Sequence, residues 1–323
     1  MAAAPKVGHR VRRAALVLLL LVLPVAPAAS RAASYFVTVA GLGGDPDYEQ
    51  RFEQWAGELD RVLKGAATDG QVVTLSGKQA TRTQLTAALQ RVAAEAQPDD
   101  DFILMLIGHG SYDGVQYKLN LVGPDISAAE LAALCDRIPA RTQLIVNTTS
   151  ASGGSIGALQ KSGRIVIAAT KTGTEKNATV FARYWVEALR DPTVDVDKNE
   201  AISALEAFQY ADRKTAAFYE SQKRLATEHP VFEDTGKREA VRAASEETGE
   251  GRLLSNFTLL RVGAAQRAAN DPAKRDLLAK KEELEQKVDT LKYQKAAMSQ
   301  DDYKKQLTET LVELARIEEE LDK

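Results

Sequence analysis

Residues 101–155 read DFILMLIGHGSYDGVQYKLNLVGPDISAAELAALCDRIPARTQLIVNTTSASGGS. This stretch contains two short apolar runs, Phe102–Ile107 and Leu144–Val146, each flanked by residues that break regular structure. Such runs are typical of buried strands. Between them, Ser127 and Glu130 have the spacing of a capping box, which predicts the start of a helix. A strand, a helix and a second strand in succession predict two parallel neighbours in one sheet.

Polar residues follow both runs. The first run leads into His109-Gly110, and the second leads into the hydroxyl-rich and glycine-rich turn Asn147–Gly154. Because the carboxyl ends of parallel strands meet at one edge of a sheet, where open α/β folds place their sites, both clusters are expected there. The sequence therefore predicts that His109 faces this turn.

The rest of residues 34–263 alternates between strand and helix patterns. Further strands are predicted at Tyr35–Leu42, Gln71–Leu75, Arg164–Ala169 and Leu253–Val262, and helices at Tyr48–Leu63, from Thr81 to about Ala96, at 128–138, after residue 175 and from about Ala201. This alternation predicts an α/β fold, a three-layer sandwich with a mostly parallel six-stranded sheet.

Composition excludes several classes of protein. The chain has 323 residues, a formal net charge of −3 and one cysteine. This charge gives no general attraction to nucleic acid or to anionic membranes, and no nucleic-acid motif is present. A single cysteine excludes an internal disulfide and a cysteine-based metal site. We expect Cys135 to be a buried structural thiol.

The first 33 residues have the three parts of a secretory signal peptide. Four Lys or Arg residues precede the apolar run Ala14–Leu23, and small residues follow it. The run is shorter than the roughly 20 residues that span a bilayer. Residues 1–33 are therefore predicted to be removed on export. The mature protein is expected in the periplasm or outside the cell, without a membrane span.

The segment 271–323 differs from the rest of the chain. Leucines recur every seven residues in two blocks, and Ser299 with Asp302 has a second capping-box spacing between the blocks. This pattern predicts an antiparallel coiled-coil hairpin of two helices. The hairpin either packs on its own domain or mediates self-association or the docking of a partner.

One acidic segment has the spacing of a calcium loop. Asp195, Asp197 and Asn199 occupy positions 1, 3 and 5, an apolar residue occupies position 8, and Glu206 occupies position 12. Glu200 stands at position 6, where the sharp turn favours glycine. The segment is thus a candidate calcium site, or alternatively an acidic loop that caps the next helix. No cofactor is expected to be required.

The order of these elements resembles the legumain and caspase class of cysteine peptidases over residues 34–263. In that class, one strand ends in His-Gly, a helix follows, and the next strand ends in Cys-x-Ser-Gly. Residues 41–52, 169–189 and 228–236 and the terminal hairpin look like bacterial secreted members of the class. The resemblance implies a caspase-like sandwich with a peptide-binding cleft. It also implies catalytic positions at His109, Gly110 and the nucleophile.

The sequence departs from the class at the nucleophile. Alignment of Ser152-Gly153 with the Ser-Gly of the motif places Ser150 where the class has cysteine. A serine hydroxyl needs an adjacent base that a third group orients, whereas a cysteine has some thiolate at neutral pH. The residues immediately before Ser150 are neutral. Cys135 precedes the strand and cannot replace the missing thiol.

Three functions follow from these observations. The first is an exported peptidase homologue without cysteine-protease activity that binds a peptide or protein in the cleft. The second is a hydrolase that uses Ser150 as nucleophile and His109 as base. The third is an adaptor that acts through the hairpin of residues 271–323.

Overall fold

The computed structural model describes residues 1, 32–66, 70–237 and 239–323. Nearly all of the predicted signal peptide lies in residues 2–31, outside the described residues. One compact unit spans Arg31–Lys323. Within the described part of this unit, no helix has both the length and the apolar character needed to cross a membrane.

A six-stranded sheet forms the centre of the unit, in the order β10-β8-β7-β3-β1-β2. The strands are β1 (Ser34–Ala40), β2 (Gln71–Leu75), β3 (Asp101–Ile107), β7 (Thr142–Asn147), β8 (Arg164–Ala168) and β10 (Val231–Glu233). All neighbours run parallel except β10, which is antiparallel to β8. This arrangement confirms the mostly parallel six-stranded sheet and the predicted parallel pairing of β3 with β7.

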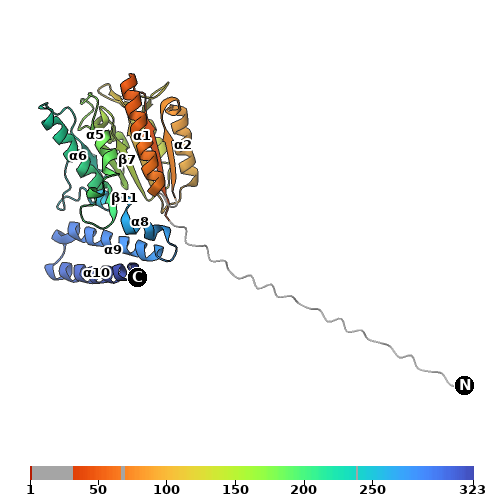
Figure 1. Ribbon diagram of the computed structural model, residues 1–323, viewed down its shortest axis with the longest axis vertical. Helices are drawn as coiled ribbons and strands as arrows, with labels where there is room; N and C mark the ends of the chain where they lie inside the picture. Colours follow the sequence, from red (N-terminus) through yellow and green to blue (C-terminus); the bar gives the residue numbers. More distant parts are fainter. Residues whose placement is uncertain (2–31, 67–69, 238) are drawn as a thin grey trace. The chain divides into compact units, whose positions relative to one another are not determined.

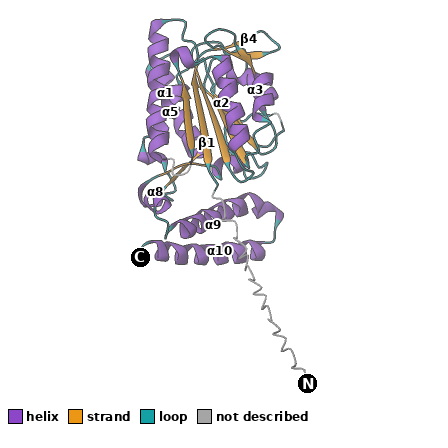
Figure 2. Cartoon of the chain, turned by 90° about the vertical axis from the view of Figure 1, so that its right-hand side faces the viewer, coloured by secondary structure: helices purple, strands orange, loops and turns teal. Residues whose placement is uncertain are grey.

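Helices cover both faces of this sheet. They are α1 (Pro46–Ala66), α2 (Arg82–Glu95), α3 (Ala128–Cys135), α4 (Ile156–Leu159), α5 (Phe181–Ala188) and α6 (Ala204–Ser221). Figure 2 shows the sheet between α1 and α5 on one side and α2 and α3 on the other.

The packing follows from the two-residue period of a strand. On β3, Ile103, Met105 and Ile107 pack in one hydrophobic core with residues of α1, α5 and α6. Phe102, Leu104 and Leu106 pack in a second core with residues of α2 and α3. These two cores on opposite faces confirm the three-layer sandwich.

One strand was predicted at the wrong place. The segment Leu253–Val262 does not join the central sheet; it forms α7 (Arg252–Ser255) and then β11 (Thr258–Arg261). β11 pairs with β9 (Ala201–Ser203) in a separate two-stranded sheet. The sixth strand of the central sheet is the shorter β10. Ser255 ends α7 and Asn256 is its C-cap, so the two apolar parts of the segment belong to a helix and to a strand.

The chain between β3 and α3 forms a small sheet that was not predicted. Its strands are β4 (Gly110–Tyr112), β5 (Tyr117–Leu119) and β6 (Ile126–Ser127), all antiparallel. Ser127 begins α3 with the predicted capping box to Glu130. A matching capping box, Ser203 with Glu206, begins α6 at residue 204, because residues 201–203 belong to β9 and not to the helix.

Two long helices follow α8 (Gly263–Asn270): α9 (Arg275–Gln294) and α10 (Gln300–Leu321), joined by a short turn at Lys295–Ser299 (Figure 1). Leu278, Leu284 and Leu291 of α9 are buried, whereas α10 is largely exposed. The Arg261 guanidinium of β11 is bonded to the Glu282 carboxylate of α9, and Arg261 also acts electrostatically on Asp101 at the start of β3. The helix pair therefore lies at the amino end of the sheet.

Candidate functional site

The predicted site residues lie at the carboxyl edge of the central sheet. His109 and Gly110 follow β3, and Ser150 follows β7, the parallel neighbour of β3. The backbone of Gly41, after β1, approaches the same edge and donates a hydrogen bond to the Ile107 carbonyl at 2.8 Å. This edge is the end of the sheet opposite to α9.

Ser150 is held by the backbone of Gly110. The Gly110 N–H donates to the Ser150 Oγ at 3.1 Å, and the Ser150 hydroxyl donates to the Gly110 carbonyl, also at 3.1 Å. Ser150 is only 2 % exposed. Both hydrogen-bonding roles of the hydroxyl are thus used to fasten the β7 loop to the chain that leaves β3.

Gly110 allows this contact because it has no side chain. A Cβ at residue 110 would lie 2.5 Å from the Ser150 carbonyl oxygen and 2.4 Å from the Tyr117 ring. Contacts this short are not found in folded proteins, so any other residue would push the two loops apart. This close contact therefore explains why residue 110 is glycine.

A buried network of hydrogen bonds holds the loop that follows β7. The Tyr117 hydroxyl lies 2.7 Å from the Thr149 Oγ1 and 3.3 Å from the Asn147 Oδ1. The Asn147 amide donates to the Ser155 Oγ at 3.1 Å. Burial raises the pKa of Tyr117 to about 12, so its hydroxyl stays protonated. Buried polar groups that are satisfied in this way fix one loop conformation.

Ala151, directly after Ser150, has a left-handed backbone with φ of 55°. This conformation is uncommon for a residue with a side chain and must be enforced by its surroundings. The Ala151 N–H donates to the Glu175 carbonyl at 2.8 Å, and the residue is completely buried. The loop after β8 therefore helps to hold the strained turn.

His109 packs against aromatic rings of α1. Its ring lies 4.7 Å from the Tyr48 ring and 5.2 Å from the Phe52 ring, edge to face in both cases. Burial lowers the pKa of His109, and a hydrogen bond to the Gly43 backbone opposes this shift. The lowered pKa favours the neutral imidazole, and α1 and the loop after β1 position its ring.

His109 and Ser150 share one edge of the sheet but not a hydrogen bond. Among the described residues, the polar partners of Ser150 Oγ are both Gly110 backbone atoms. A serine nucleophile requires a base within hydrogen-bond reach and a group that orients this base. The Gly110 N–H donates to Ser150 Oγ and is therefore not free to bind a ligand.

A second histidine, His229, lies at the same edge and was not predicted from the sequence. Its Nδ1 lies 2.5 Å from the Glu175 Oε1, and its backbone N–H donates to the Glu175 Oε2 at 3.2 Å. The two residues are 54 positions apart, and they meet because β10 runs antiparallel to β8. Only the tertiary pairing brings them together, so no local sequence pattern marks them.

Glu228, next to His229, is a buried carboxylic acid. It is 2 % exposed and accepts hydrogen bonds from the Val180 and Phe181 N–H groups, at the start of α5, and from the Tyr219 hydroxyl. Burial raises the pKa of Glu228 to about 7, although these three hydrogen bonds oppose the shift. Glu228 thus fixes the loop between β8 and α5.

The acidic segment of residues 195–206 lies at the other end of the molecule, beside α9. Ligand oxygens of Asp195, Asp197 and Glu206 lie within 4.8 Å of one another. The Lys281 Nζ of α9 donates to the Asn199 carbonyl at 2.8 Å. Carboxylates gathered in this way suit calcium, which prefers oxygen ligands. Calcium binding stays a prediction.

The backbone of this segment adopts the turn that a calcium loop needs at position 6. Glu200 has φ of 67°, the left-handed value that normally requires glycine. Its side chain leaves the loop and accepts a hydrogen bond from the Ala265 N–H of α8 at 2.8 Å. Asn199 Oδ1 accepts from the Ala201 N–H, and Glu206 Oε1 accepts from the Val196 N–H. The alternative, an acidic loop that caps the helix near residue 201, is met only in part, because Ser203 caps α6 in a capping box with Glu206 and the other acidic residues bond within the loop or to α8.

The comparisons with known proteins give structural neighbours only. No protein-family profile matches the chain, and no curated protein matches it. The Drosophila initiator caspase Dronc is 10 % identical with a TM-score of 0.41, covering 69 % of this chain and 84 % of the caspase. Caspase-1 from Spodoptera frugiperda is 12 % identical with a TM-score of 0.44, covering 63 % and 87 %.

A protein from Geobacter sulfurreducens is 13 % identical with a TM-score of 0.43, covering 64 % of this chain and 94 % of that protein. Caspases are thus among the structural neighbours of the chain. At this level of similarity, the neighbours assign no activity, substrate or catalytic residue to it.

Proposed function

We propose that the protein is an exported, peptidase-like α/β domain that binds peptide segments at the carboxyl edge of its sheet and does not cleave them. The resemblance of its sequence to legumains and caspases supports the peptidase-like layout. In this proposal, Ser150 is a structural residue, and His109 contributes to a binding surface.

The hydrogen bonds of Ser150 carry the proposal. Its hydroxyl both accepts from and donates to the Gly110 backbone, so its proton and one of its two lone pairs are committed. To attack a carbonyl, the hydroxyl would first have to leave Gly110 and reach a base. Its burial also opposes the approach of a substrate carbonyl.

Exposed apolar side chains around the edge support binding. Leu42 follows β1 and is 39 % exposed, Val115 lies between β4 and β5 and is 90 % exposed, and Leu225 precedes β10 and is 91 % exposed. In this proposal, the three side chains supply the apolar contacts to a bound peptide. The rigid network around Tyr117 gives this surface a fixed frame.

The proposal is tested with the purified mature protein and a library of peptide substrates. We expect no hydrolysis above background, and the same result for Ser150→Ala. Selection from a displayed random-peptide library should give binders that Val115→Ser weakens and that Val312→Ser, a change of an exposed valine of α10, leaves unaffected. Turnover that Ser150→Ala abolishes would refute the proposal and favour the serine-hydrolase alternative.

A further inference from the structure

A groove of about 580 Å³ lies between the helix pair α9–α10 and the segment 196–206. We call it the hairpin groove and define it by Val196 and Asp197 of the segment, Glu285 and Asp289 of α9, and Leu311 of α10. Its volume is in the range of sites that hold a ligand or a short peptide segment. It lies at the amino end of the sheet, away from Ser150.

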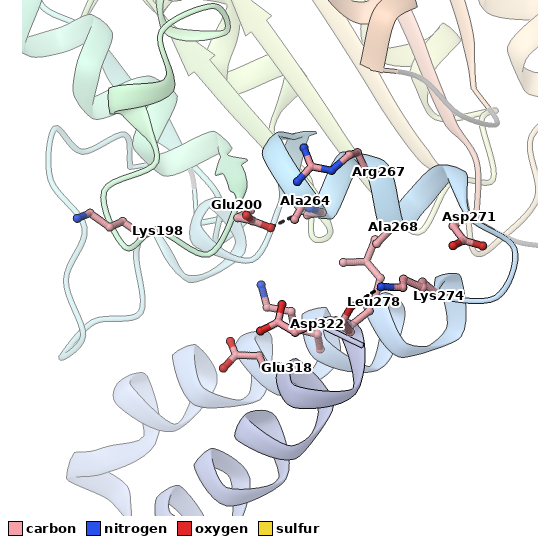
Figure 3. A pocket seen from close by; sticks show the side chains of 13 residues that line it. Lys198, Glu200, Ala264, Arg267, Ala268, Asp271, Lys274, Leu278, Glu318 and Asp322 are labelled. Atoms are coloured by element: carbon pink, nitrogen blue, oxygen red, sulfur yellow. Dashed lines mark hydrogen bonds between the residues drawn. The ribbon is translucent and has the colours of Figure 1, made fainter.

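A neighbouring cavity of about 560 Å³ differs in charge. Figure 3 shows it among side chains of the loop at residues 198–200, α8, α9 and the end of α10. The described residues that line it include four acidic and four basic side chains, so its charges balance. By contrast, the hairpin groove is lined by seven acidic residues and two lysines among the described residues.

Three carboxylates of the hairpin groove already have cationic partners. Glu282 pairs with Arg261, Glu285 pairs with Lys281 at 3.3 Å, and Asp289 pairs with Lys292 at 2.6 Å. The other four acidic residues have no ion pair within the described part of the chain; they are Asp197, Glu206, Glu246 and Glu318. The groove therefore keeps a net negative charge after its internal pairs are counted.

The carboxylates of the groove lie close to one another. Oxygens of Asp197 and Glu206 lie within 4.8 Å of each other, so their negative charges repel. Burial raises the pKa of Glu285 to about 7, an effect that Lys281 opposes and Asp197 adds to. Added positive charge in the groove would relieve this repulsion.

Apolar side chains are exposed on the walls of the groove. Val196 is 63 % exposed and Leu311 is 45 % exposed, and they come from two different elements, the segment 196–206 and α10. An occupant that only carried charge would leave both in water. A surface that combines apolar side chains with one sign of charge fits an amphipathic segment of opposite charge.

We propose that the hairpin groove binds a basic, amphipathic peptide segment of a partner protein, with lysine or arginine side chains against Glu246 and Glu318 and apolar side chains against Val196 and Leu311. This surface is distinct from the carboxyl edge, and the inference does not depend on peptide binding there. A metal ion alone would neutralise Asp197 but would not cover Leu311.

The test uses the full mature chain and a synthetic helical peptide of about 14 lysine and leucine residues, roughly 21 Å long as a helix. Fluorescence anisotropy of the labelled peptide should report binding at low salt. The affinity should fall about ten-fold or more between low salt and roughly 0.5 M salt, because salt screens exposed charges. A peptide with glutamate in place of lysine should not bind.

Matched variants locate the binding. Glu246→Gln combined with Glu318→Gln should weaken binding about three- to ten-fold, the loss of two exposed charge pairs. Glu309→Gln combined with Glu320→Gln changes the net charge equally, but these residues lie outside the groove lining, so the affinity should not change.

A second pair of variants tests the contact between Leu311 and the apolar side chains of the peptide. Leu311→Ser should weaken binding about three-fold or more. Val312→Ser, the adjacent exposed residue of α10, lies outside the groove lining and should have no effect. Equal losses in a groove variant and its control would show nonspecific attraction and overturn the proposal, as would the absence of binding at low salt.

Discussion

Removing the Ser150 hydroxyl should destabilise the protein without changing any catalytic rate. In Ser150→Ala, the Gly110 N–H and the Gly110 carbonyl both lose their Ser150 partner. The replacement is small and fits the space of serine, so no steric clash is added. The effect on the free energy of unfolding therefore reports the two hydrogen bonds.

The magnitude follows from the two bonds. Each hydrogen bond contributes about 0.5–1.5 kcal/mol net, and buried groups left unpaired add to the loss. Because Ser150 is 2 % exposed, water does not readily replace the hydroxyl. We expect a loss of about 2 kcal/mol, roughly 4–8 °C in the melting temperature.

Urea unfolding followed by circular dichroism measures this loss. Ser111→Ala is the matched control, because Ser111 is an exposed serine on β4 directly after Gly110. It should change the free energy of unfolding by less than about 0.5 kcal/mol. If Ser150→Ala were as stable as the control, the two hydrogen bonds would not fasten the loops, and the structural role given to Ser150 would be wrong.

Three further predictions concern calcium, the hairpin and pH. Calcium should bind the Asp195–Glu206 loop with a dissociation constant of about 10⁻⁴–10⁻³ M. In calorimetry, Asp195→Asn should abolish the heat of calcium binding. Absence of heat from the wild type at several millimolar calcium would contradict this prediction. Deletion of residues 271–323 should lower the unfolding midpoint, but the truncated protein should still unfold cooperatively. The reason is that the two cores on the faces of the sheet contain no residue of this segment. Loss of cooperative unfolding would show that the hairpin is part of the core. In the folded protein, the pKa of Glu228 is raised from 4.5 to about 7, so its contribution to stability is complete below about pH 4.5 and is lost as the pH rises through 7. Between pH 4.5 and 8, the free energy of unfolding of the wild type should fall by up to about 3 kcal/mol more than that of Glu228→Gln. Parallel pH profiles of the two proteins would contradict the shift.

Strands with strong local patterns were predictable from the sequence. The runs that became β1, β2, β3, β7 and β8 are apolar, rich in β-branched residues and bounded by breakers. Their order with the helices between them determined the three-layer sandwich. The short β10 has three residues, one of them Glu233, and its pairing with β8 depends on the whole intervening chain. Its local pattern was therefore too weak to compete with Leu253–Val262.

The site was predictable in part. The positions of His109, Gly110 and Ser150 at one sheet edge followed from the parallel pairing of β3 with β7. The hydrogen bonds of Ser150 did not follow, because they depend on how closely the Gly110 backbone approaches. The pair Glu175 and His229 was missed because a reversed strand, and not a local spacing, joins them.

The central claim, that Ser150 is a structural residue and not a nucleophile, is tested most directly by covalent labelling. The folded protein is incubated with a fluorophosphonate, which reacts with activated serines, and peptide mass spectrometry then locates the label. We predict no modification of Ser150, because its hydroxyl is buried and bonded to Gly110. Labelling of Ser150 that is lost in His109→Ala would contradict the claim and identify an active serine enzyme.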